Sequence, residues 1–150
     1  MGAEAHLRRA TLDDLNSLVE LEQVGFATDR FSKSQYRHLI THAKGIVFVI
    51  EQKGALMGSA ALLWRKGSQK ARLYSIVVAP DARGRGLGHM LLEACEDEAR
   101  RHGLTALTLQ VRADNKSAIE FYARHGFVES GRLLNYYDDQ TDGLEMRKCI

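Results

Sequence analysis

A glycine-rich turn between a strand-like run and a helix-like run constrains the fold of this chain more than any other feature. Residues 73–79 are apolar and rich in β-branched side chains, and they end at Pro80, the only proline in the sequence. Gly84, Gly86 and Gly88 follow at alternate positions, and a helical pattern begins directly after them. Glycines let a ligand approach the backbone closely, and the first N–H groups of a helix attract anions. The sequence therefore predicts a phosphate-binding site at this turn.

The hydrophobic periodicity of the whole chain predicts the element order β-α-α-β-β-β-α-β-α-β-β. The expected strands are residues 6–9, 46–50, 56–64, 71–79, 105–112, 127–133 and 143–148. The expected helices begin after Thr11, Ser32, Gly86 and Asp114 or Asn115, and they end by Phe26, Gly45, Gly103 and Gly126. Three consecutive strands joined by short turns indicate an antiparallel meander, so we expect a single α+β domain over residues 1–150.

The composition of the chain excludes several classes of protein but does not indicate a function. The formal net charge of +2 is too small to argue for a nucleic-acid or membrane partner, and no apolar stretch approaches the roughly 18 residues that span a bilayer. Cys95 and Cys149 make no disulfide framework, the N-terminus lacks an apolar signal core, and the six histidines show no ligand spacing. We therefore expect a cytoplasmic protein without a metal, present as a monomer or a homodimer.

Several kinds of glycine loop can be compared with residues 84–89. A dinucleotide fingerprint would need a glycine where the chain has His89, and a Walker loop would need Lys-Ser or Lys-Thr after the last glycine. An RNA-binding Arg-Gly tract would be repeated, whereas this chain has one copy between a strand and a helix. A purely structural turn at a strand–helix junction stays open at this point.

A second motif lies further along the chain. Residues 110–115 read Gln-Val-Arg-Ala-Asp-Asn, and Ala118, Tyr122 and the pair Gly126-Phe127 follow at fixed spacings. Together with Arg83-x-x-Gly86-x-Gly88, this pattern resembles the GNAT superfamily of N-acetyltransferases over about residues 73–127. Residues 134–137 and the Asp-rich stretch after them further resemble the ribosomal-protein alanine acetyltransferase group.

The resemblance implies a fold, a cosubstrate and a set of binding residues. The fold would be an α/β/α-like sandwich around a mixed, mostly antiparallel sheet of about six to seven strands with about four helices. The cosubstrate would be acetyl-CoA, with its pyrophosphate held by backbone N–H groups of Arg83, Gly84, Arg85, Gly86, Leu87 and Gly88. The pantetheine arm would pair with the backbone of Ile76, Val77 and Val78, where the strand splays from its neighbour, and would bond to the side chain of Asn115.

Each of these residues also has a plainer interpretation. The two loop arginines are equally well explained as solvated side chains. Asn115 is a suitable helix N-cap, and Tyr122 lies two helical turns further on, where a core aromatic would sit. The family role of Tyr122 is that of the general acid that protonates the departing CoA thiolate.

Gln110 departs from the pattern of the group that the chain resembles. That group has a glutamate at the matching strand position as its proposed general base, whereas a glutamine can only position a water or the amine. An acceptor of low pKa needs less help with deprotonation, so a protein or peptide α-amino group is favoured. A small-molecule amine (a polyamine, amino acid or antibiotic) and a weakly active CoA-binding module are the alternatives.

The acceptor end of the site is expected from two further segments. By family analogy, Tyr136 and Tyr137 would lie near the acceptor, with Asp138, Asp139 and Asp142 attracting a cationic amine or forming an ordinary polar turn. The segment from Gly25 to Phe31 connects two expected helices and can shape a substrate pocket.

Overall fold

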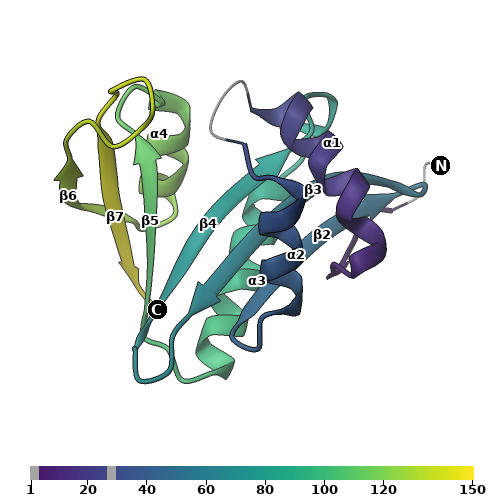
Figure 1. Ribbon diagram of the computed structural model, residues 1–150, viewed down its shortest axis with the longest axis horizontal. Coiled ribbons are helices and arrows are strands. Elements are labelled where there is room, and N and C mark those ends of the chain that lie inside the picture. Colours follow the sequence, from purple (N-terminus) through teal and green to yellow (C-terminus); the bar gives the residue numbers. More distant parts are fainter. Residues whose placement is uncertain (1–3, 27–29) are drawn as a thin grey trace.

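The computed structural model describes residues 4–26 and 30–150, which form one mixed sheet flanked by helices (Figure 1). The strands are β1 (His6–Arg9), β2 (Gly45–Gln52), β3 (Ala55–Trp64), β4 (Lys70–Val78), β5 (Ala106–Arg112), β6 (Val128–Leu133) and β7 (Gly143–Cys149). The helices are α1 (Leu15–Gly25), α2 (Lys33–Thr41), α3 (Leu87–Arg101) and α4 (Lys116–Arg124), with short 3-10 turns η1 (Leu12–Asp14) and η2 (Pro80–Ala82). The predicted α+β class and element order are confirmed.

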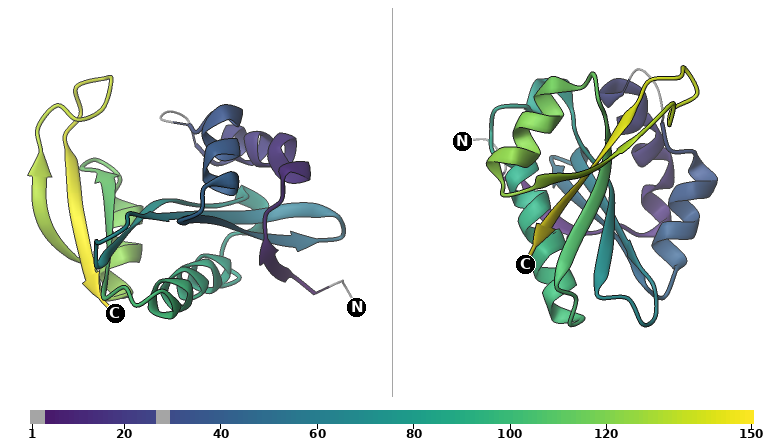
Figure 2. Two further views of the ribbon diagram at one scale, coloured as in Figure 1. Left: turned by 60° about the horizontal axis from the view of Figure 1, so that its bottom comes forward. Right: turned by 90° about the vertical axis from the view of Figure 1, so that its left-hand side faces the viewer.

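The order of strands across the sheet is β1-β2-β3-β4-β5-β7-β6. Every neighbouring pair is antiparallel except β4 and β5, which are parallel and are connected through α3. Helices α1 and α2 cover one face of β2–β4, and α3 covers the opposite face (Figure 2). The predicted mixed, mostly antiparallel sheet between helical layers is therefore confirmed.

The starts of the first two helices follow from short polar signals. The backbone N–H of Thr11 donates to Asp14 at 2.7 Å, and Asp14 also pairs with Arg8 at 2.8 Å. Ser32 and Gln35 form a reciprocal capping box at the start of α2. The first of these signals opens η1 rather than α1 itself, which begins three residues later than the sequence suggested.

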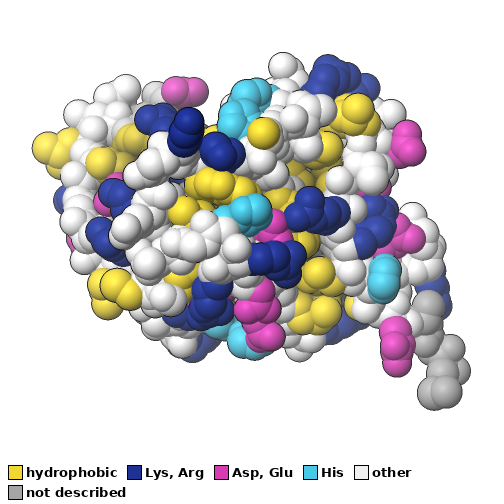
Figure 3. Space-filling view, turned by 90° about the horizontal axis from the view of Figure 1, so that it is seen from below, with side chains coloured by type: hydrophobic (Ala, Val, Ile, Leu, Met, Phe, Trp, Pro, Cys, Tyr) yellow, Lys and Arg dark blue, Asp and Glu magenta, His cyan; other side chains and the backbone are white. Residues whose placement is uncertain are grey.

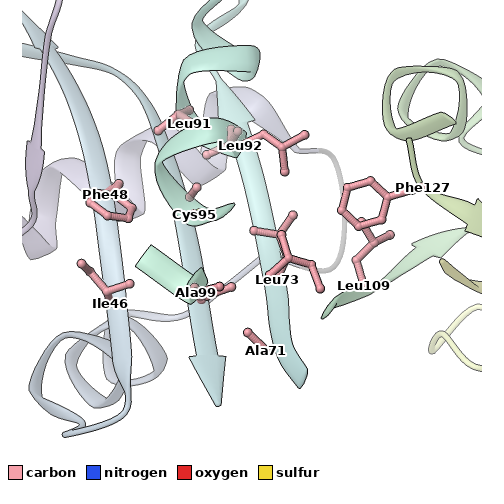
Figure 4. Packing of buried hydrophobic residues seen from close by; sticks show 14 of the residues in the cluster. Ile46, Phe48, Ala71, Leu73, Leu91, Leu92, Cys95, Ala99, Leu109 and Phe127 are labelled. Carbon is pink, nitrogen blue, oxygen red and sulfur yellow. The ribbon is translucent and has the colours of Figure 1, made fainter. Parts of the chain in front are cut away.

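The core has two parts because β2 buries both of its faces. Ile46, Phe48 and Ile50 belong to the cluster beneath α3, whereas Val47 and Val49 belong to the cluster beneath α1 and α2. In Figure 4, side chains of α3 lie over strand residues of the larger cluster. Burying one such Leu, Ile or Phe side chain stabilises the fold by about 1.5–3 kcal/mol.

Side chains of both charges occur together on one face of the molecule. On the face seen in Figure 3, Lys and Arg side chains are interspersed with Asp and Glu side chains. Within the described ranges, no helix is both long and apolar enough to cross a membrane.

The pairing between β4 and β5 is short, and this positions the site. Only Lys70–Arg72 of β4 pair with Ala106–Thr108 of β5. Beyond that point β4 stays with β3 as far as Val78, and β5 stays with β7 as far as Arg112. The two strands therefore diverge beyond Arg72 (Figure 1).

Candidate active site

Two adjacent cavities occupy the opening between β4 and β5. The first, of about 650 Å³, is bordered by the glycine turn and the start of α3, and we call it the loop cavity. The second, of about 630 Å³, is bordered by Tyr74, Tyr122, Tyr136 and Tyr137, and we call it the tyrosine cavity. Both volumes are in the range of small-molecule sites. Both cavities are lined by Gly25, Phe26, Ile76, Asn115, Ala118 and Tyr122, so they meet at these residues.

The glycine turn leaves the start of α3 open to an anion. Gly84 and Gly86 have φ values of +82° and +79°, a region that side chains with a Cβ rarely adopt. Gly86 is the N-cap of α3 and has no side chain to bond the first N–H groups of the helix. These donors and the positive end of the helix dipole therefore remain for a ligand, and the geometry fits a phosphate group.

The arginines of the turn lie on its rim. The Nε of Arg83 donates to the carbonyl of Val78 at 3.3 Å, and Arg83 lines the loop cavity. Arg85 reaches Gln52 at 3.2 Å and the carbonyl of Asp81 at 3.4 Å, outside both cavities. Of the two predicted charges, only that of Arg83 borders the space where a phosphate fits.

The backbone of Ile76, Val77 and Val78 borders the loop cavity. Among the described residues, the edge of β4 that faces β5 has no strand partner after Arg72. An unpaired strand edge presents N–H and C=O groups to a ligand that can pair with them. The strand separation that the resemblance implied is thus present in the fold.

Asn115 is the N-cap of α4. Its side-chain oxygen accepts from the N–H of Ala118 at 3.2 Å and from the hydroxyl of Ser117 at 3.3 Å. Its NH2 group has no hydrogen-bond partner within the described ranges. The capping role and a ligand-binding role are therefore compatible, because they use different atoms of one amide.

Tyr122 lies where the two cavities meet. Its ring packs edge-on against Phe121 and Phe127, with centroid distances of 5.4 and 5.5 Å. Burial raises the pKa of its phenol above the ordinary tyrosine value, so the hydroxyl stays protonated at neutral pH. No described residue forms a hydrogen bond with that hydroxyl. Tyr122 therefore packs as a core aromatic residue, and its hydroxyl is also available as a hydrogen-bond donor.

Gln110 lines the tyrosine cavity together with Tyr122. It lies on β5 opposite Glu145 of β7 and is partly buried. The structure therefore brings Gln110, Asn115 and Tyr122 to one cavity from two elements.

The loop after β6 places Tyr136 and Tyr137 in the tyrosine cavity. The Tyr136 hydroxyl accepts from Arg72 at 3.3 Å, and the guanidinium carbon of Arg112 lies 4.9 Å from the centre of the Tyr137 ring. Both aromatic residues thus line the same cavity as Gln110 and Tyr122, and their place beside the acceptor stays a prediction.

The acidic residues of that loop do not face the acceptor end of the opening. Asp139 pairs with Arg112, which lowers the pKa of its carboxyl to about 2, and Asp142 pairs with Arg132 at 2.9 Å. Neither they nor Asp138 line the tyrosine cavity. Arginines from neighbouring strands hold two of these carboxylates in the loop, which favours the alternative that the stretch is an ordinary polar turn.

Four residues of the tyrosine cavity were not singled out from the sequence: Glu22, Arg72, Tyr74 and Ser75. Glu22 is only 1% exposed, and its carboxylate accepts from the Tyr36 hydroxyl and from the N–H of Phe31. Burial raises the pKa of that carboxyl above its ordinary value. The sequence did contain a signal for this residue, because Glu22 is a charged side chain among the apolar positions of α1.

The segment from Gly25 to Phe31 borders the cavity at both of its ends. Gly25, Phe26 and Phe31 line the tyrosine cavity, whereas residues 27–29 lie outside the described residues. Within residues 4–26 and 30–150, no three side chains of His, Cys, Asp or Glu gather as a metal site.

Comparison with known proteins adds a family to this geometry. The Acetyltransferase (GNAT) family profile matches residues 12–127. An uncharacterized N-acetyltransferase of Methanocaldococcus jannaschii is 31% identical in an alignment of 136 positions, and the match covers 82% of this chain and 60% of that protein. A putative ribosomal-protein alanine N-acetyltransferase of Bacillus subtilis is 28% identical over 142 residues, which are 95% of this chain and 93% of that protein.

A solved structure extends the similarity to three dimensions. The crystal structure of the ribosomal-protein alanine N-acetyltransferase from Escherichia coli matches with a TM-score of 0.87 and 29% sequence identity. The match covers 98% of this chain and 94% of that chain. This chain spans less than two thirds of the archaeal relative and nearly the whole length of the two bacterial ones.

Proposed function

Because the chain belongs to the GNAT family of N-acetyltransferases, we propose that it transfers the acetyl group of acetyl-CoA to the α-amino group of a protein or peptide. The observation that carries the proposal is the meeting of two cavities at Asn115 and Tyr122, beside the unpaired edge of β4. The names of the bacterial relatives, which describe alanine N-acetyltransferases of ribosomal proteins, support the choice of acceptor.

The loop cavity is the proposed site of the CoA moiety. Backbone N–H groups between Arg83 and Gly88 bind the pyrophosphate, and the positive end of α3 stabilises its charge. The backbone of Ile76–Val78 pairs with the amides of the pantetheine arm, and the free NH2 of Asn115 donates to one of its carbonyls. These contacts direct the thioester toward the place where the cavities meet.

The tyrosine cavity is the proposed site of the amine. The neutral amine nitrogen attacks the thioester carbonyl carbon, a C–N bond forms, and the C–S bond breaks. The hydroxyl of Tyr122 donates its proton to the departing thiolate, which suits a phenol that burial keeps protonated. The proton lost by the amine passes to a water that Gln110 positions, since an amide side chain cannot itself accept it.

The absence of a carboxylate at position 110 favours an acceptor of low pKa. An α-amino group with a pKa near 7.8 is about 14% neutral at pH 7, whereas a lysine side chain near 10.4 is about 0.04% neutral. The difference is roughly 350-fold in the concentration of the reactive form. An enzyme that relies on water as proton acceptor therefore acetylates peptide N-termini in preference to lysines.

The test uses pairs of peptides that differ only in which amine is free. One peptide has a free N-terminal alanine and no lysine, and its partner has a blocked N-terminus and one internal lysine. The purified protein is incubated with acetyl-CoA, CoA release is followed by thiol titration, and the acetylated amine is identified by mass spectrometry. We expect acetylation of the free N-terminus. A higher kcat/KM for the lysine peptide would refute the choice of acceptor.

The same assay separates the alternatives. A panel of polyamines, amino acids and aminoglycosides tests the small-molecule acceptors under identical conditions. Binding of CoA by calorimetry without turnover of any acceptor would identify a CoA-binding module instead.

A further inference from the structure

Arg72 lies at the point where β4 and β5 part. It is the last residue of β4 that pairs with β5, opposite Thr108, and its side chain lines the tyrosine cavity. The guanidinium carbon is 4.2 Å from the centre of the Tyr74 ring. One terminal nitrogen reaches the Tyr136 hydroxyl at 3.3 Å, and the other makes a long contact of 3.5 Å with the Tyr74 hydroxyl. The cation is thus held in place by two neutral tyrosines.

No carboxylate of the described residues pairs with this cation. The Nε of Arg72 is buried and makes no hydrogen bond. Arg112, the other arginine of the cavity, contrasts with it, because Arg112 pairs with Asp114 at 3.2 Å and also with Asp139. An arginine that is buried in part and lacks an anionic partner is unusual, since its desolvation is not offset by an ion pair.

The remaining acidic side chains of the cavity do not compensate the charge of Arg72. The Glu22 carboxylate is occupied by Tyr36 and by the N–H of Phe31, and burial raises its pKa, which favours its neutral form. Asp114 is occupied by Arg112. Among the described residues, Arg72 is thus the one cation of the cavity without a paired carboxylate, and an acceptor that carries an anion would complete the pairing.

We propose that Arg72 binds a carboxylate of the acceptor, so that the enzyme prefers amines that carry a carboxylate close to the reacting nitrogen. The inference rests on the proposed function of the tyrosine cavity as the acceptor site. A guanidinium binds a carboxylate with two parallel hydrogen bonds. The Tyr136 hydroxyl, which accepts from Arg72, is free to donate its own proton to the same carboxylate.

Two sources can supply this carboxylate. One is an aspartate or glutamate side chain at the second or third position of a peptide, and the other is the α-carboxylate of a free amino acid. The chemistry at Arg72 is the same for both. A peptide pair and an amino-acid pair therefore form separate arms of the test.

The peptide arm compares Ala-Glu and Ala-Gln at the N-terminus of otherwise identical sequences. The amino-acid arm compares free alanine with alaninamide. Each pair is assayed with wild-type protein, with Arg72→Gln and Arg72→Lys, and with Arg65→Gln as the control. Arg65 is exposed in the turn after β3 and lines neither cavity. Thermal unfolding of each variant checks that the fold is retained.

The wild-type protein should favour the carboxylate member of at least one pair by roughly tenfold or more in kcat/KM, the worth of a charged hydrogen bond. Arg72→Gln should abolish this preference, so that the ratio of kcat/KM between the two members of a pair falls to about one, while Arg65→Gln leaves the wild-type ratio unchanged. Arg72→Lys should keep part of the preference, because it retains the charge without the planar fork. The arm that shows the preference identifies the source.

The proposal fails if the wild-type protein shows no preference in either arm, or if Arg72→Gln retains it. Failure of the proposed function has a different signature, namely no turnover of any amine. In that case the same pairs are compared as ligands by calorimetry with the CoA-saturated protein. Equal binding of both members would then overturn the role of Arg72.

Discussion

Two substitutions of Asn115 separate its structural role from its proposed role in CoA binding. The side-chain oxygen caps α4 through Ala118, whereas the NH2 group is free beside both cavities. Asn115→Asp keeps an oxygen for the cap and removes the donor. Asn115→Ala removes both. Asn115→Asp therefore tests the ligand-binding role alone, and Asn115→Ala tests both roles together.

The magnitudes follow from these contacts. Loss of an N-cap side chain costs about 1 kcal/mol, which lowers Tm by roughly 2–4 °C in a chain of this size. Aspartate is as good a cap as asparagine and suits the positive helix end, so Asn115→Asp should unfold near the wild-type temperature. Loss of one neutral hydrogen bond costs about 0.5–1.5 kcal/mol, which weakens CoA binding by roughly 2- to 13-fold.

Thermal unfolding and calorimetric titration with CoA measure the two effects on the same samples. We expect Asn115→Ala to lose both stability and affinity, and Asn115→Asp to lose affinity alone. A carboxylate facing a pantetheine carbonyl should be at least as unfavourable as no side chain, so its affinity loss should equal or exceed that of alanine. Wild-type CoA affinity in Asn115→Asp would show that the amide only caps the helix.

Four further changes test other parts of the site. Tyr122→Phe should lower kcat by roughly 10²- to 10⁴-fold, as expected for loss of a general acid, while CoA affinity and Tm stay near wild type; unchanged kcat would make Tyr122 a packing residue. Gln110→Glu should supply the missing base and raise kcat/KM for lysine peptides more than for free N-termini, measured across pH. Gly88→Ala would place a Cβ 3.2 Å from the Phe121 ring, so we expect weaker CoA binding by calorimetry and a modest loss of Tm. Burial raises the pKa of Glu22, so its stabilising contribution is present at low pH and is lost as pH rises through the folded-state pKa; Glu22→Gln should flatten that part of the Tm–pH curve, and an unchanged curve would contradict it.

The parts of the fold that the sequence predicted depend on neighbours in the chain. The strand, turn and helix around Gly84–Gly88 carry their own signals, namely an apolar run, a proline, glycines of positive φ and an amphipathic repeat. In the sheet, β7 lies between β5 and β6, and no short stretch of sequence predicts this order. The order depends on pairing between β5 and β7, whose paired residues are more than 30 positions apart in the chain. The separation of β4 from β5 came only from the family resemblance.

The candidate site divides in the same way. Gln110, Asn115 and Tyr122 were singled out because they match a motif of the family that the chain resembles, which extends over one strand and the next helix. Arg72 was missed because its distinguishing feature is the absence of a carboxylate partner among the described residues. That absence can be recognised only when the partners of the surrounding acidic side chains are known. The ion pair of Asp139 could not be predicted either, since its partner Arg112 lies 27 residues earlier in the chain.

The short pairing of β4 with β5 links the two halves of the site. Had the strands paired beyond Arg72, their backbone groups would have bonded to each other, and neither cavity would exist. Their divergence leaves the edge at Ile76–Val78 to a ligand, and it also leaves Arg72 at the closed end of the opening, beside Tyr136 from the loop that precedes β7. Under the proposed function, this one interruption of the sheet gives the cosubstrate a backbone to pair with and gives the acceptor a cation. The two proposals then predict that substitutions at Arg72 change acceptor preference without changing the affinity for CoA.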